Sequence, residues 1–106
     1  MKDIAEKYPK VWTLVVDKLP LVVRLELFQN KAIDDNLRFS LLFGYLVLEF
    51  FPKYGIYVNG NIKIGFTLWV DGVGLIMTGK LNLENFKTPQ QAIEKAFEIL
   101  EKQLND

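Results

Sequence analysis

The side chains that perform covalent catalysis are almost absent from this sequence. It contains no cysteine and no histidine, which removes the thiol nucleophile, the commonest general base and the commonest metal ligand. Its one serine, Ser40, lies within a run of apolar residues and has no histidine to activate it. We therefore predict no catalytic residues and interpret Ser40 as a small residue at a helix–helix contact.

The acidic residues that could bind a metal or act as an acid–base pair lack suitable spacing. Asp34 and Asp35 precede an apolar helical segment, where carboxylates cap a helix and complement its dipole. Glu49 is flanked by apolar residues and is expected to extend its carboxylate to solvent. Residues 71–74 contain two glycines, but neither their spacing nor a following helix fits a nucleotide-binding loop. The sequence therefore predicts a protein that is not an enzyme and uses no metal and no cofactor.

Composition indicates one folded domain over residues 1–106. Hydrophobic residues make up 50% and charged residues 25% of the chain, which is the balance of a globular protein. The charges of 13 basic and 13 acidic residues cancel, so the net charge is zero and the chain has no overall attraction for polyanions. The longest apolar stretch, residues 39–48, is too short to span a bilayer, and the start lacks a signal-peptide pattern. We expect a cytoplasmic protein without a membrane segment.

Apolar spacing predicts two helices and one strand in the first half. Residues 4–19 follow a helical pattern in which Pro9 marks either a kink or the start of a new helix. Residues 37–51 form an apolar central helix that ends before a proline. Residues 21–29 alternate charged with apolar side chains, which favours a strand.

Residues 55–83 are typical of an antiparallel meander. The pairs Asn-Gly at 59–60 and Asp-Gly at 71–72 are preferred in two-residue hairpin turns. The second turn then places Leu68 opposite Leu75 on the core face of the sheet. We predict three antiparallel strands, with residues 21–29 as an optional fourth.

The chain closes with a predicted helix over residues 89–104. Thr88 is its N-cap, Pro89 occupies the first helical position and Gln91 completes a capping box. Glu101 is expected on the solvent side. The expected buried stripe consists of Ala92, Ile93, Ala96, Phe97, Leu100 and Leu104. The predicted fold is therefore α+β, with the N-terminal, central and C-terminal helices packed on a three- or four-stranded antiparallel sheet.

The outer face of the predicted sheet is the candidate binding surface. It combines Trp69, Thr67 and Ile76 with Lys63 and Lys80, which oppose each other across two strands. The N-terminal helix could cover this face, a protein partner could bind it, or nucleic-acid bases could stack on it. Nucleic acid ranks last because the face has only two lysines and the net charge is zero. We predict these five residues as partner contacts.

Two terminal motifs carry a resemblance. The chain reads Tyr-Pro-Lys-Val-Trp at residues 8–12 and Thr-Pro-Gln-Gln-Ala-Ile-Glu-Lys-Ala-Phe-Glu-Ile-Leu-Glu at residues 88–101. Both segments resemble the ends of small uncharacterised proteins of bacteriophages and prophages. The resemblance implies a mobile-element protein that works in the bacterial host cytoplasm. Such small proteins are often inhibitors of host defence, including anti-CRISPR proteins.

We therefore expect a non-enzymatic binding protein that inhibits a larger host protein or ribonucleoprotein. In its narrower form, this expectation is an anti-CRISPR that acts on an RNA-guided effector or its guide RNA. The alternative is a homo-oligomeric structural or assembly module, in which the apolar helix around Ser40 and Gly44 or the sheet edge forms a homodimer. A small single-stranded nucleic-acid binder is the third hypothesis.

Overall fold

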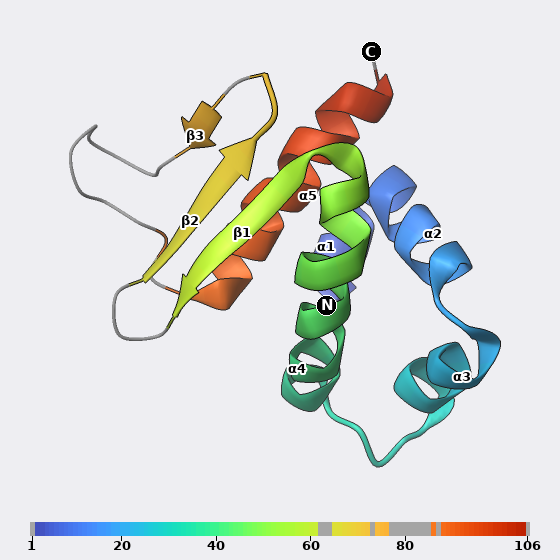
Figure 1. The fold of residues 1–106 in the computed structure, drawn as a ribbon. Coiled ribbons are helices and arrows are strands. Elements are labelled where there is room, and N and C mark those ends of the chain that lie inside the picture. The colour runs from blue at the N-terminus through green and yellow to red at the C-terminus, as the bar shows by residue number, and fades with distance from the viewer. Residues whose placement is uncertain (1, 62–64, 73, 77–85, 87, 106) are drawn as a thin grey trace.

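The computed structural model describes residues 2–61, 65–72, 74–76, 86 and 88–105. The chain is α+β and mostly helical, with an antiparallel sheet, so the α+β part of the predicted fold is confirmed (Figure 1). In chain order the elements are α1 (Lys2–Lys7), α2 (Pro9–Lys18), α3 (Leu21–Gln29), α4 (Asp35–Tyr45), η1 (Leu46–Phe50), η2 (Phe51–Tyr54), β1 (Ile56–Asn61), β2 (Gly65–Val70), β3 (Gly74–Ile76) and α5 (Pro89–Asn105).

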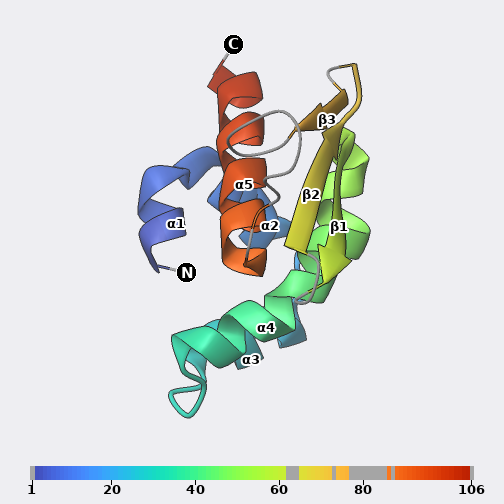
Figure 2. The same ribbon diagram turned by 90° about the vertical axis from the view of Figure 1, so that its left-hand side faces the viewer.

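The sheet buries one face against α5. β1 and β2 pair antiparallel over six residues each, and the three residues of β3 pair with the other edge of β2. Helix α5 lies across the buried face, as Figures 1 and 2 show. The core contributions of the strands are Ile56, Val58, Phe66, Leu68 and Val70, and those of α5 are Ala92, Ile93, Ala96, Phe97 and Leu100. Five of the six positions predicted for the α5 stripe are therefore confirmed, and Leu104 is exposed.

The predicted hairpin turn at Asn59 and Gly60 is wrong. Both residues lie inside β1, where they pair with Thr67 and Phe66 of β2. Gly60 has a φ of +132°, and a Cβ atom built on it would lie 2.1 Å from the carbonyl oxygen of Gly65. This glycine therefore permits a close approach of two strands instead of forming a turn.

Burial of apolar side chains explains the observed register. The observed register aligns Ile56 with Val70 and Val58 with Leu68, and all four side chains lie in the core. A two-residue turn at the Asn-Gly pair would set Val58 opposite Asn61 and remove this match.

The second hairpin is shifted by one residue from the prediction. Leu68 pairs with Ile76, not with Leu75. Three residues instead of two therefore connect β2 to β3, and Gly72, at a φ of +83°, supplies the left-handed position that such a loop needs. The remainder of the predicted third strand falls on residues 77–85, outside the described residues.

Residues 21–29 form helix α3, so the predicted strand at this place is wrong. Most of the segment consists of Leu, Arg, Glu and Gln, which favour a helix. Two arginines also satisfy carbonyl groups at helix ends, where backbone donors are lacking. Arg24 donates to the carbonyl oxygen of Leu19, and Arg38 of α4 donates to that of Leu27 at 2.7 Å. The Arg24 bond thus joins α3 to the end of α2 and the Arg38 bond joins α4 to the last turn of α3, and the segment does not join the sheet.

The predicted central helix extends over residues 35–54 and changes type along its length. α4 passes directly into the π-helical turn η1 and the 3₁₀ turn η2. Asp34 caps the start, as predicted, and its carboxylate accepts a hydrogen bond from the Leu37 N–H at 2.8 Å. The change of helix type places the adjacent residues Phe50 and Phe51 both in the core.

The break predicted near Pro9 is the start of a new helix, α2. The N-cap residue of α2 makes no side-chain cap. Instead, Glu101 of α5 accepts hydrogen bonds from the backbone N–H groups of Val11 at 2.9 Å and Lys10 at 3.2 Å. Glu101 is only 9% exposed, so its predicted position on the solvent side is wrong. This carboxylate joins the last helix to the first turn of α2.

Candidate functional site

The outer face of the sheet carries an aromatic pair. The register places Tyr57 of β1 directly opposite Trp69 of β2, and Asn59 opposite Thr67. Directly opposed residues lie on the same face of an antiparallel sheet, so these four residues form one surface. Trp69 is 47% and Tyr57 37% exposed, whereas the apolar residues that alternate with them are buried, namely Ile56, Val58, Phe66, Leu68 and Val70. We call these four residues the aromatic sheet face.

Two of the five predicted contact residues lie on this surface. Trp69 and Thr67 share the aromatic sheet face, as predicted. Ile76 pairs with Leu68, which belongs to the buried face, so the one-residue shift removes position 76 from the predicted cluster. Lys63 and Lys80 lie outside the described residues.

Sequence reasoning missed Tyr57 and Asn59 because their positions depend on the first hairpin. With the turn placed at Asn59, neither residue could oppose a partner on β2. The alternation of apolar residues in β1 gave the one available signal, since Tyr57 lies between Ile56 and Val58, which are both buried.

The N-terminal helices do not cover the aromatic sheet face. Helix α2 packs on α5, and Figure 2 shows α5 between α1 and the sheet. The buried residues of α2, Val11 and Val15, belong to the same core as the α5 stripe. The interpretation in which Trp69 is a core residue beneath the N-terminal helix is therefore wrong.

The aromatic sheet face is uncharged over the described strands. Neither β1 nor β2 contains an acidic or basic residue. Its polar groups are the Tyr57 hydroxyl, the Trp69 indole N–H, the Asn59 amide and the Thr67 hydroxyl. These groups can bury aromatic area and exchange a few neutral hydrogen bonds, and the described residues of β1 and β2 offer no charged donor for a phosphate.

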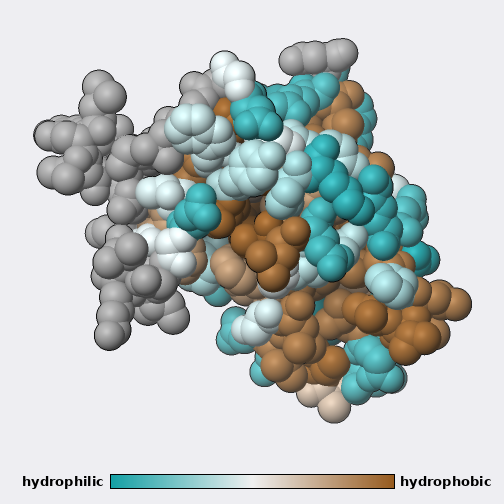
Figure 3. All heavy atoms as spheres, in the orientation of Figure 1, coloured by the Kyte–Doolittle hydropathy of each residue, from teal (hydrophilic) through white to brown (hydrophobic). Residues whose placement is uncertain are grey.

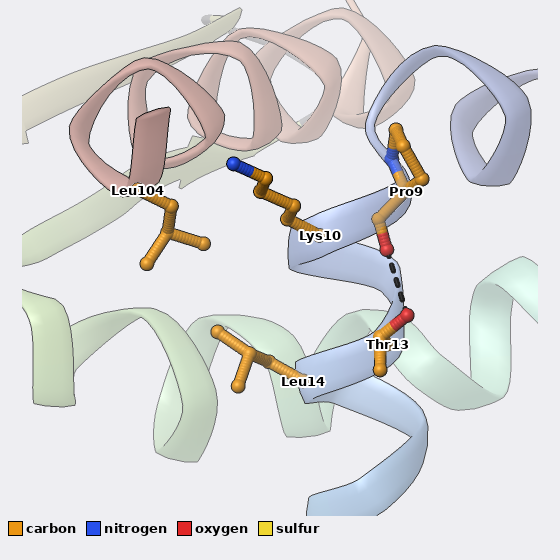
Figure 4. Close-up of a pocket in the computed structure, with 5 residues that line it drawn as sticks. All are labelled: Pro9, Lys10, Thr13, Leu14 and Leu104. Atoms are coloured by element: carbon orange, nitrogen blue, oxygen red, sulfur yellow. Dashed lines mark hydrogen bonds between the residues drawn. The ribbon is translucent and has the colours of Figure 1, made fainter. Parts of the chain in front are cut away.

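A shallow depression lies between α2 and α5. It is an open, mostly apolar depression lined by Pro9, Lys10, Thr13, Leu14 and Leu104 (Figure 4). The Thr13 hydroxyl donates to the Pro9 carbonyl oxygen at 2.9 Å, and the Lys10 ammonium donates to the side-chain oxygen of Asn105. The polar side chains of the depression are thus engaged within the protein, and none of them forms a nucleophile–base pair.

The described part of the chain holds no group of three or more acidic, histidine or cysteine side chains that could bind a metal ion. Within the same residues, no helix is both long and apolar enough to cross a bilayer. Comparison of the chain with protein families, with curated proteins and with solved structures finds no match.

Proposed function

We propose that this chain is a non-enzymatic binding protein that docks a larger protein on its aromatic sheet face. The observation that carries the proposal is the exposed Trp69 side chain opposite Tyr57 on the outer face of the sheet. Tryptophan and tyrosine are enriched in the residues that dominate protein–protein binding energies. They offer a large apolar area together with a polar tip, and only two side-chain torsions are fixed on binding.

The neighbours of the aromatic pair support a protein as the partner. Asn59 and Thr67 add neutral polar groups beside the rings, which matches the apolar centre and polar rim of a protein interface. Nucleic-acid binding depends on lysine and arginine contacts to phosphates, and β1 and β2 contain no such residues. The proposed partner therefore presents an apolar pocket that accepts the indole ring.

The narrower form of the proposal names the class of partner. The resemblance of residues 8–12 and 88–101 to the ends of small phage proteins supports an inhibitor of host defence. In that form, the protein acts in the bacterial cytoplasm on an RNA-guided effector or its guide RNA. Such an inhibitor needs only a shaped surface, which agrees with the absence of histidine and cysteine from the sequence.

The test compares two single substitutions on immobilised protein exposed to a bacterial lysate. Trp69→Ala removes the indole, and Leu104→Ala, which changes a similarly exposed side chain on α5, serves as the matched control. An interface tryptophan contributes at least about 2 kcal/mol, so we expect Trp69→Ala to weaken capture by about 30-fold. Circular dichroism of both variants must show the wild-type spectrum and melting curve.

Each outcome bears on a different part of the proposal. A protein that the wild type and Leu104→Ala retain, and that Trp69→Ala loses, supports docking on the aromatic sheet face. Equal retention by all three proteins refutes that surface. Nuclease treatment tests the narrower form, because a partner lost with the RNA indicates a guide-RNA complex, while a partner that persists binds as a protein. A labelled RNA that binds the isolated chain with a steep salt dependence would contradict the choice of a protein partner.

A further inference from the structure

The central helix carries an unpartnered apolar stripe. Leu37, Leu41 and Leu48 are 47%, 53% and 77% exposed, although all three are large apolar residues. Gly44 lies between Leu41 and Leu48 on the same side, because spacings of three and four residues return to one face of a helix, and Leu48 follows in the π-helical turn η1 that continues α4. We call these four residues the α4 stripe.

Neither a close contact with the described residues nor a special backbone conformation requires a glycine at position 44. A Cβ atom built on Gly44 meets no described atom within 4 Å, and its backbone does not adopt a positive φ. Glycine destabilises a helix interior relative to alanine, so the described part of the chain does not explain why this position is a glycine. The open space above Gly44 can accommodate a side chain from another molecule.

Helix α3 enlarges the apolar surface beside the stripe. Leu21, Val22 and Leu25 are exposed on α3, and Figure 3 shows hydrophobic side chains gathered over α3 and α4. Together with Leu37, Leu41 and Leu48, these side chains make six large apolar residues that are each at least 40% exposed on α3 and on the continuous helix formed by α4 and η1. Soluble monomers rarely expose large apolar patches, and such patches mark interaction sites, so we expect this surface to be covered by another molecule.

We infer that the α4 stripe is the interface of a homodimer in which two copies of α4 pack antiparallel. The spacing of the stripe is the same from either end, so a second copy in the opposite direction presents the same pattern. Leu41 of each copy then faces Gly44 of the other, and Leu37 faces Leu48. A two-fold axis between residues 42 and 43 generates this contact, and closed two-fold dimers are the commonest oligomers.

Charge at the two ends of the helix favours the antiparallel direction. The acidic residue Asp34 caps the start of α4, and Lys53 lies exposed near the end of η2. Among the described residues, Lys53 has no ion-pair partner. Antiparallel packing brings Lys53 of one copy within about one helical turn of Asp34 of the other, whereas parallel packing would bring like charges together.

The first test measures mass against protein concentration by sedimentation velocity. We expect the wild type to move from 12.3 kDa toward twice that mass as the concentration rises. Leu41→Glu places a charge at the centre of the stripe and should weaken association at least 100-fold. Leu104→Glu places the same charge on an exposed leucine of α5 and should leave association unchanged. Because Leu41 is already half exposed, Leu41→Glu should melt like the wild-type monomer.

The second test distinguishes the direction of packing. The chain has no cysteine, so a single introduced thiol reports only on its own position. Near the proposed axis, Leu41→Cys should form a disulfide-linked dimer under mild oxidation. Leu37→Cys should not, because antiparallel packing separates the two copies of residue 37 by about three helical turns. If Leu37→Cys cross-links as efficiently as Leu41→Cys, the antiparallel arrangement is overturned.

Three results would overturn the inference. The first is a mass that stays at 12.3 kDa up to millimolar concentration. The second is an equal loss of association in Leu41→Glu and Leu104→Glu. The third is co-sedimentation of a monomer with anionic lipid vesicles that Leu41→Glu abolishes, which would assign the stripe to a membrane surface. Trp69→Ala should leave self-association intact. The homodimer and the docking of a partner on the aromatic sheet face can therefore be refuted separately.

Discussion

The contact between the Glu101 carboxylate of α5 and the first turn of α2 is well suited to a quantitative test. The carboxylate accepts the Val11 N–H at 2.9 Å in a buried setting and the Lys10 N–H at 3.2 Å in a partly buried one. The first N–H groups of a helix have no partner within the helix and carry its positive dipole end. Replacement by alanine therefore removes two charge-assisted hydrogen bonds and leaves the Val11 N–H buried without an acceptor.

The expected loss follows from these contacts. A hydrogen bond to a charged group contributes about 1.5–3 kcal/mol to the free energy of unfolding. We assign the full contribution to the buried Val11 bond and a smaller one to the Lys10 bond, which is longer and partly exposed to solvent. Glu101→Ala should therefore lower the free energy of unfolding by about 3 kcal/mol. For a domain of about 100 residues this lowers the melting temperature by roughly 12–24 °C. Glu101→Gln keeps one acceptor oxygen but loses the charge, and should cost about 1 kcal/mol.

Equilibrium unfolding in urea, followed by circular dichroism at one fixed protein concentration, measures these differences. Glu94→Ala is the matched control on the same helix, because Glu94 pairs with Lys7 in an exposed salt bridge at 3.2 Å. Exposed pairs contribute less than about 1 kcal/mol. The reasoning fails if Glu101→Ala is no more destabilising than Glu94→Ala, or if Glu101→Gln is as destabilising as Glu101→Ala.

Four further predictions concern the cap of α4, the core and the titration of two single groups. Asp34→Ala removes the N-cap of α4 and should cost about 1 kcal/mol in urea unfolding, and an unchanged midpoint would contradict the capping role. Phe97→Ala empties a fully buried site between other rings and should cost about 3–5 kcal/mol, and a loss below that of the cap variant would show that the core collapses around the site. The hydrogen bond from Lys95 holds the pKa of Glu98 below its ordinary value, so the stabilisation is present at neutral pH and is lost as the pH falls through the lowered pKa. Glu98→Gln should flatten this part of the stability–pH curve by a small amount, because the carboxylate is partly exposed. Burial, with a further contribution from a nearby carboxylate, raises the pKa of Tyr45, so in an ultraviolet absorbance titration Tyr45→Phe should lose one step that lies above the ordinary tyrosine pKa.

Local chemistry was sufficient to predict the elements with strong end signals. Asp34 as a cap and Pro89 as a first helical residue follow from backbone donors that lack partners and from the fixed φ of proline. The α5 stripe follows from the helical repeat of its apolar residues, and five of its six positions are buried. The α+β class and the position of Trp69 on the sheet face opposite the core strand residues also follow from patterns within short segments, but the exposure of Trp69 does not.

Contacts between distant segments decided the features that the sequence did not reveal. The Asn-Gly pair is a strong turn signal, but the burial of Ile56 and Val58 against β2 outweighs it and moves the turn. Residues 21–29 alternate like a strand, yet bonds from Arg24 and Arg38 to carbonyl groups at helix ends support a helix.

The same distinction applies to function. The sequence by itself determined that histidine and cysteine chemistry is absent and that one strand carries a tryptophan between buried positions. Only the tertiary structure determined that Tyr57 lies opposite Trp69 and that Glu101 is buried at the start of α2. The physical reason is that strand register and burial depend on which distant segments meet, and the burial of apolar side chains between those segments favours one pairing over another.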